Sequence, residues 1–251
     1  MHKISTDTLF IGRKLIYVPI CHSTNDIALD LLHQKTPEEG TTVITDHQTA
    51  GRGQRGNSWY SEPSKNLMFS LILYPKFLPL QQQYFLNIFI SLAICDTLSQ
   101  WIGSGLKIKW PNDIYFLDRK IGGILTENSI KNNALEYSII GIGLNINQTN
   151  GLPEGASSLG NITGSELNLS ELFNNLVVHI EKRYLELRAQ KFDHLRAQYL
   201  NNLYWYQEEH VFSNGNYFKG IILGVDSGGR LMIETQGTVK SFDIKEIKFI
   251  N

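Results

Sequence analysis

Apolar residues recur along the first half of the chain in short runs that predict β-strands. These runs are bounded by Gly, Pro, Asn or Asp, which commonly end strands and begin turns. The segments expected to be strands are 14–20, 41–45, 67–74, 106–110, 114–117, 121–127 and 136–147. In the last of them, alternation places Gly141, Gly143, Asn145 and Asn147 on one face and large aliphatic residues on the other. We expect the face without large side chains to form the floor of a ligand site.

Longer patterns with helical spacing predict three helices. The expected segments are 23–34, 80–101 and 170–202, the last with a break near 190–193. Ser23 followed by Asp26 resembles a capping box, and Ser170 is the expected cap of the last helix. Residues 118–120 are expected to form a turn, and residues 148–168, which are rich in Gly, Asn and Ser, a loop.

The pattern changes near Val211, where short apolar runs are separated by Gly-containing turns. This pattern predicts a small all-β module of about 45 residues. The chain of 251 residues is long enough for one large domain with such an appendage. We therefore predict a first domain over residues 1–205 and a second over residues 206–251.

Composition restricts the classes of function. The 23 basic and 24 acidic residues nearly balance, which gives no support for broad nucleic-acid binding. Cys21 and Cys95 form no CxxC pair, and the start of the chain does not resemble a secretory signal, so a reducing, cytoplasmic location is expected. Polar residues such as Asn87 and Asp96 interrupt the most apolar window, which favours a buried helix over a membrane span.

The Gly-rich loop, residues 48–59, combines three glycines with Arg52 and Arg55. Glycine permits close approach of the backbone to a ligand, and arginine matches the geometry of phosphate and carboxylate groups. The segment is therefore a candidate anion clamp. A solvated surface loop explains the same composition, and the residues alone leave both readings open.

A second cluster follows the strand expected at 106–110. Asn112 and Asp113 offer an amide and a carboxylate, which suit Mg²⁺ or the positioning of a base, and Lys120 adds a cation beside two glycines. The alternative is a hairpin whose turn carries ordinary charged residues. No histidine spacing typical of a zinc site occurs in the chain.

Taken together and in order, these motifs resemble those of the biotin–protein ligases. The resemblance rests on Ser23-Thr24-Asn25 and four further segments, 48–59, 109–113, 119–125 and 141–147. It covers about residues 14–147, and the C-terminal β module also fits. It implies an α+β fold in which helices back a mixed sheet, as in class II aminoacyl-tRNA synthetases, followed by a small SH3-like β barrel. Lipoate ligases and octanoyltransferases share the broader fold.

The resemblance assigns roles to individual residues. Those implied to bind biotin are Ser23, Thr24, Asn25, Gln48, Gly51, Arg52, Gly53, Lys120, Gly123, Leu125, Gly141 and Gly143. Those implied to bind ATP or the adenylate are Arg52, Arg55, Trp59, Asn112, Lys120, Asn145 and Asn147. Arg52, Lys120 and Asp113 are the implied catalytic residues. Magnesium is expected to arrive with ATP, with Asp113 as the one protein group considered as a ligand.

The implied reaction uses ATP and Mg²⁺ to activate biotin as biotinyl-5′-AMP and then transfers biotin to a lysine of a biotin carboxyl carrier domain, as of acetyl-CoA carboxylase. Lipoate or octanoate transfer and a non-catalytic biotin or adenylate sensor are the alternatives. About 13 residues precede the first expected strand, too few for a helix-turn-helix domain, so no DNA binding is expected. The resemblance leaves monomer and homodimer open. Many family members have arginine at the position of Gln54, and we hypothesise a looser adenylate clamp here.

Overall fold

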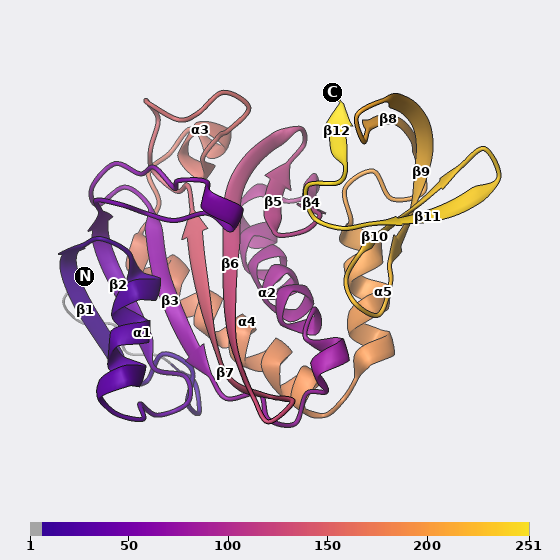
Figure 1. Ribbon diagram of the computed structural model, residues 1–251. Helices are drawn as coiled ribbons and strands as arrows, with labels where there is room; N and C mark the ends of the chain where they lie inside the picture. Colours follow the sequence, from indigo (N-terminus) through magenta and orange to yellow (C-terminus); the bar gives the residue numbers. More distant parts are fainter. Residues whose placement is uncertain (1–6, 251) are drawn as a thin grey trace.

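The structure is a computed structural model that describes residues 7–250, apart from the side chain of Arg55. Its centre is a seven-stranded sheet in the order β1-β2-β3-β7-β6-β5-β4 (Figure 1). β1 and β2 pair in parallel, and every other neighbouring pair is antiparallel. The strands are β1 (Leu15–Cys21), β2 (Thr42–Gln48), β3 (Leu67–Leu73), β4 (Leu106–Lys109), β5 (Asp113–Phe116), β6 (Arg119–Lys131) and β7 (Ala134–Leu144). The expected mixed sheet is confirmed.

Alternating side chains of the strands form cores on opposite faces of this sheet. The larger core contains Ile44, Leu71 and Ile140 and packs against helices α2 and α4. The neighbouring residues Val43, Ile72 and Ile139 pack on the other face, against helix α1. The helices are α1 (Thr24–Gln34), α2 (Phe85–Ile102), α3 (Leu159–Thr163), α4 (Leu169–Arg188) and α5 (Phe192–Asn202), with single 3₁₀ turns η1 (Gln54–Gly56) and η2 (Leu80–Gln82).

The helix α2 lies in the middle of the larger core. Twelve of its residues, from Phe85 to Leu98, are buried. Within residues 7–250, Leu80–Ile102 is the segment long and apolar enough to cross a membrane, but 67% of its most apolar window is buried inside the fold. Burial of this kind is typical of a core helix in a globular protein.

The C-terminal module is a five-stranded antiparallel sheet in the order β11-β10-β9-β8-β12. Its strands are β8 (Glu209–Ser213), β9 (Tyr217–Val225), β10 (Leu231–Thr235), β11 (Thr238–Phe242) and β12 (Lys248–Ile250). This arrangement fits the small SH3-like module expected. Its apolar residues join the larger core, and the indole Nε1 of Trp110 donates to the carbonyl of Gly229 at 2.8 Å. The division at residues 205 and 206 stays a prediction.

Several boundaries differ from those expected. Leu117 adopts a φ of 51°, so the turn falls at Leu117–Asp118 and Arg119 and Lys120 already belong to β6. The strand β7 ends at Leu144, before the two asparagines that were expected to lie on it. The helix expected from residue 80 begins at Phe85, because a separate 3₁₀ turn follows Pro79.

Two expected caps and one expected loop were also wrong. Ser23 occupies the N-cap position of α1, but its side chain makes no capping hydrogen bond. Asn168 rather than Ser170 caps α4, since its side chain accepts from the N–H groups of residues 170 and 171. The loop after β7 contains the short helix α3, whose N-cap Ser158 accepts from the N–H of Asn161.

Candidate functional site

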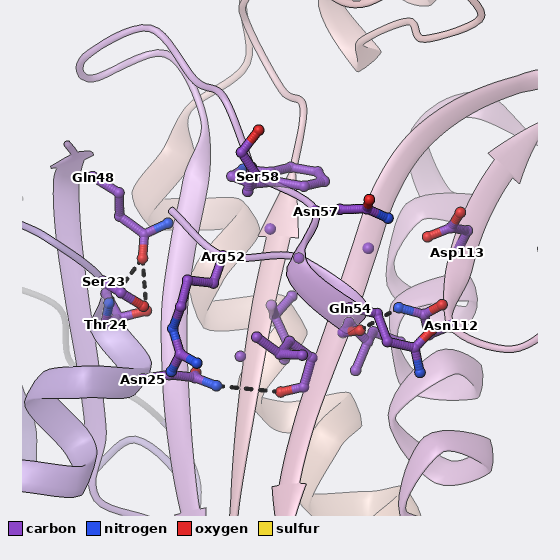
Figure 2. Close-up of a pocket in the computed structure, with 18 of the residues that line it drawn as sticks. Ser23, Thr24, Asn25, Gln48, Arg52, Gln54, Asn57, Ser58, Asn112 and Asp113 are labelled. Carbon is purple, nitrogen blue, oxygen red and sulfur yellow. Dashed lines mark hydrogen bonds between the residues drawn. The ribbon is translucent and has the colours of Figure 1, made fainter. Parts of the chain in front are cut away.

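A pocket of about 230 Å³ opens on the α1 face of the large sheet. It is formed where the start of α1, the end of β2, the Gly-rich loop and the strands β5, β6 and β7 meet (Figure 2). The pocket brings together residues expected from distant parts of the sequence: Ser23, Thr24, Asn25, Gln48, Arg52, Gly53, Trp59, Asn112, Asp113, Lys120, Gly123, Leu125, Gly141 and Gly143. Its size lies below the usual range of about 300–1,000 Å³ for ligand sites.

The floor of the pocket is backbone, because glycines of β6 and β7 face each other there. Gly123 pairs with Gly143, and Leu125 pairs with Gly141. The indole of Trp59 rests on this floor: a Cβ added to Gly143 would lie 2.5 Å from Trp59 Cε2. The buried indole Nε1 of Trp59 has no hydrogen-bond partner. The Gly-rich loop thus closes over the sheet, and its tryptophan reduces the space left for a ligand.

One end of the pocket is a network of neutral hydrogen-bonding groups. The Oε1 of Gln48 accepts from the backbone N–H of Thr24 at 2.8 Å and from its hydroxyl at 3.2 Å. Ser70, from the centre of β3, donates to Asn25 Oδ1 at 2.5 Å and lies 2.7 Å from Thr24 Oγ1. Figure 2 shows Gln48, Thr24 and Asn25 gathered on one side of the pocket. These fixed amides and hydroxyls suit a polar ligand group with both donors and acceptors.

Arg52 holds the Gly-rich loop against this end. Its guanidinium forms two hydrogen bonds to Glu127, at 2.9 and 3.0 Å, and one to Asp26, at 2.8 Å. Burial would lower the pKa of Arg52, but the bonds and charges of Glu127 and Asp26 outweigh it and raise that pKa. The arginine is therefore a permanent cation whose charge is met by two carboxylates.

The opposite end carries a second ion pair. The Nζ of Lys120 lies 2.7 Å from Asp113 Oδ1 and 5.7 Å from the centre of the Trp59 ring. Asn112 is buried, and its amide donates to the carbonyl of Ile124 at 2.6 Å, which ties the segment before β5 to β6. Lys120 has one carboxylate partner where Arg52 has two, so it is the cation more available to an anionic ligand.

Some expected site residues lie elsewhere. Asn145 and Asn147 do not line the pocket; their amides donate to the backbone carbonyls of Ser157 and Leu167 and hold the loop after β7. Gly51 is not among the lining residues; its carbonyl accepts from the N–H of Trp59. The side chain of Arg55 lies outside what the structure describes.

Sequence reasoning missed three groups that shape the site. Glu127 lies two residues beyond Leu125 on the same face of β6, so the strand periodicity could have pointed to it. Ser70 is the single hydroxyl in the apolar run of β3, a signal of a buried polar contact. Asp26 directly follows Asn25, and only its pairing with the distant Arg52 gives it a place in the site.

A protein-borne metal centre is not evident in the part of the chain that the structure describes, because no three His, Cys, Asp or Glu residues cluster there. Magnesium does not need such a centre: it commonly binds through one or two carboxylates and the phosphates of a substrate. Asp113, at the edge of the pocket, supplies one carboxylate of that kind. The donor set therefore fits a metal ion that arrives with a nucleotide.

Comparison with known proteins gives consistent results. Residues 17–145 match the model of the biotin/lipoate A/B protein ligase family. The chain is 32% identical to the bifunctional ligase/repressor BirA of Bacillus subtilis, over 96% of this chain and 75% of that protein. It is 27% identical to the biotin–[acetyl-CoA-carboxylase] ligase of Mycobacterium tuberculosis, over 90% and 85% of the two chains.

A solved structure is similar over nearly the whole length. The biotin protein ligase of Aquifex aeolicus in complex with biotin and ATP has a TM-score of 0.78 at 26% identity, covering 94% of this chain and 98% of that one. Family match, sequence relatives and solved structure all agree with the resemblance drawn from the five motifs. The chain belongs to the biotin/lipoate A/B protein ligase family.

Proposed function

We propose that the protein is an ATP-dependent biotin–protein ligase. It activates biotin as biotinyl-5′-AMP and transfers biotin to a lysine of a biotin carboxyl carrier domain. The observation that carries this proposal is one pocket with a neutral polar end at Thr24, Asn25 and Gln48 and an ionic end at Lys120 and Asp113. Biotin has the matching polarity, with a ureido group at one end and a carboxylate at the other.

The first step joins two anionic groups. A carboxylate oxygen of biotin attacks the α-phosphorus of ATP, the bond from that phosphorus to the bridging oxygen breaks, and pyrophosphate leaves. Lys120 lies at the ionic end of the pocket and reduces the repulsion between the carboxylate and the phosphate. Asp113, 2.7 Å away, orients the ammonium group. Magnesium, held by Asp113 and the substrate phosphates, would supply further charge neutralisation when bound.

The second step transfers biotin. The uncharged amine of a carrier lysine attacks the carbonyl carbon of the mixed anhydride, the carbon–oxygen bond to phosphate breaks, AMP leaves and the amine releases a proton. Until then the anhydride must be kept from water. The Gly-rich loop, tied down by Arg52 and covering the floor with Trp59, is suited to that task.

Arg52 enters this proposal differently from the sequence-based expectation. Its three hydrogen bonds to Glu127 and Asp26 already compensate its charge within the protein. We therefore assign the neutralisation of phosphate charge chiefly to Lys120, and to Arg52 the closure of the loop. The carrier domain as partner, the monomer or homodimer state, the absence of DNA binding and the cytoplasmic location stay predictions.

The test of this function is a comparison of adenylation substrates. Purified protein with ATP and Mg²⁺ is given isotope-labelled biotin or lipoate, and acyl-adenylate and pyrophosphate are measured. The proposal predicts an adenylate from biotin at far lower concentration than from lipoate. Preferential use of lipoate or octanoate would place the protein in the other branch of its family, and tight biotin binding without adenylate would favour a sensor.

A further inference from the structure

The carboxylate of Glu127 connects two parts of the pocket that come from different elements. It accepts two hydrogen bonds from Arg52 of the Gly-rich loop and one, at 2.6 Å, from the amide Nδ2 of Asn25 at the start of α1. Its side chain is 37% exposed, so it does not serve as a packing residue of the core. Glu127 itself lies on β6, the strand that also supplies Gly123 and Leu125 to the pocket.

The contact with Arg52 fixes the position of the loop. A bidentate pair between a guanidinium and a carboxylate holds both planar groups in one relative orientation. Asp26 of α1 accepts a further hydrogen bond at 2.8 Å from the same Arg52 nitrogen that contacts Glu127. The loop is therefore tied both to the sheet and to α1, and Glu127 provides two of these three bonds.

The contact with Asn25 fixes the orientation of an amide. Because Nδ2 donates to Glu127, Oδ1 is turned toward Ser70, which donates to it. Gly141 makes room for this arrangement, since a Cβ there would lie 2.4 Å from Asn25 Oδ1. The network continues through Ser70 to Thr24 and Gln48, which form the polar end of the pocket.

We infer that Glu127 is a positioning residue that couples closure of the Gly-rich loop, through Arg52, to recognition of the ureido end of biotin, through Asn25. The inference rests on the proposed function for the identity of the ligand. Without the carboxylate, Arg52 keeps its bond to Asp26, while the amide Nδ2 of Asn25 loses its 2.6 Å bond and keeps only the longer one, at 3.5 Å, to the carbonyl of Leu125 (Figure 2). Loop closure and biotin affinity then weaken together, although Glu127 is not assigned to the reacting atoms.

The test compares Glu127→Ala and Glu127→Gln with the wild type and with Glu136→Ala. Glu136 is a matched control, because it also pairs with a cation on the sheet, Lys131, at 3.5 Å and outside the pocket lining. Biotin affinity is measured by calorimetry, the release of biotinyl-AMP by stopped flow, and the adenylation kcat at saturating biotin. Hydrogen exchange of residues 48–59 is measured without ligand.

For Glu127→Ala we expect biotin affinity to fall and biotinyl-AMP release to accelerate, each by about tenfold, as for coupled groups in one network. The adenylation kcat is expected to stay within about threefold, and Glu127→Gln, which keeps an oxygen acceptor, to recover part of the loss. Removing Glu127 from an Arg52→Ala variant should change release little further, and removing it from an Asn25→Ala variant should change affinity little further.

The two proposals fail in different ways. A wild-type protein that forms no adenylate contradicts the proposed ligase function. In that case hydrogen exchange of residues 48–59 still tests whether Glu127 holds the loop closed. Faster exchange of residues 48–59 in Glu127→Ala but not in Glu136→Ala supports the role of Glu127 in closing the loop. Unchanged loop exchange, or unchanged biotin affinity and adenylate release in an otherwise active enzyme, overturns the inference.

Discussion

Replacing Lys120 with alanine separates the catalytic from the structural role of the ionic end of the pocket. The substitution removes the ammonium group that lies 2.7 Å from Asp113 and leaves the carboxylate at the pocket edge without its partner. If Lys120 neutralises the charge that builds up as biotin attacks ATP, its loss removes one preorganised electrostatic contact. Such losses lower kcat by about 10²–10³-fold, or roughly 3–4 kcal/mol.

The cost to folding should be much smaller. The side chains of Lys120 and Asp113 are 33% and 25% exposed, so solvent screens their attraction. Pairs of this kind contribute about 0.2–1 kcal/mol to stability. For a chain of this length we therefore expect the melting temperature to fall by no more than about 4 °C.

The assay is biotin-dependent exchange of labelled pyrophosphate into ATP, combined with thermal unfolding. Lys131→Ala is the matched control: Lys131 lies on the same strand β6 and forms an exposed ion pair with Glu136. We expect exchange to be nearly abolished in Lys120→Ala and unchanged in the control, with both proteins folded. Wild-type exchange in Lys120→Ala would refute the role given to this lysine.

Three further predictions concern the loop, the floor and the core. Gln54→Arg should slow the release of biotinyl-AMP by about two- to fivefold, because it adds a cation at the pocket lining. Equal release rates of the variant and the wild type in stopped flow would refute the hypothesis of a looser adenylate clamp. Gly141→Ala should displace Asn25 and weaken biotin binding about tenfold through overpacking, and calorimetry with an unaltered Kd would contradict this. Burial raises the pKa of Cys95 to about 12, so at pH 8 its thiol should resist alkylation until the protein unfolds, and mass spectrometry of labelled native protein checks this.

Sequence patterns predicted the strands of the sheet well, because alternation of apolar and small residues is strong where one face is buried. The opposed roles of Ile140 and Gly141 in β7 follow directly from that alternation. The same periodicity failed for Asn145 and Asn147. The chain leaves the sheet after Leu144, and beyond that point alternate residues no longer share one face of a strand. Such boundaries depend on the local backbone conformation. At Leu117, for example, a φ of 51° ends one strand and turns the chain into the next.

Pairing between distant segments was beyond local reasoning. The Gly-rich loop was recognised as cationic, but its Arg52 meets carboxylates 75 and 26 residues away in the sequence. Periodicity orders residues along one element and does not say which charges of two elements come together. As a result, the sequence correctly located the pocket lining around Arg52 but missed Glu127 and Asp26, which engage its charge.

The most direct measurement of the central claim is transfer of biotin to protein. Purified enzyme is incubated with biotin, ATP, Mg²⁺ and a purified biotin carboxyl carrier domain, alongside the same domain with its acceptor lysine changed to arginine. The account predicts ATP-dependent biotinylation of the first domain, detected with streptavidin and by mass, and none of the second. Formation of biotinyl-AMP without transfer to any carrier domain would contradict it.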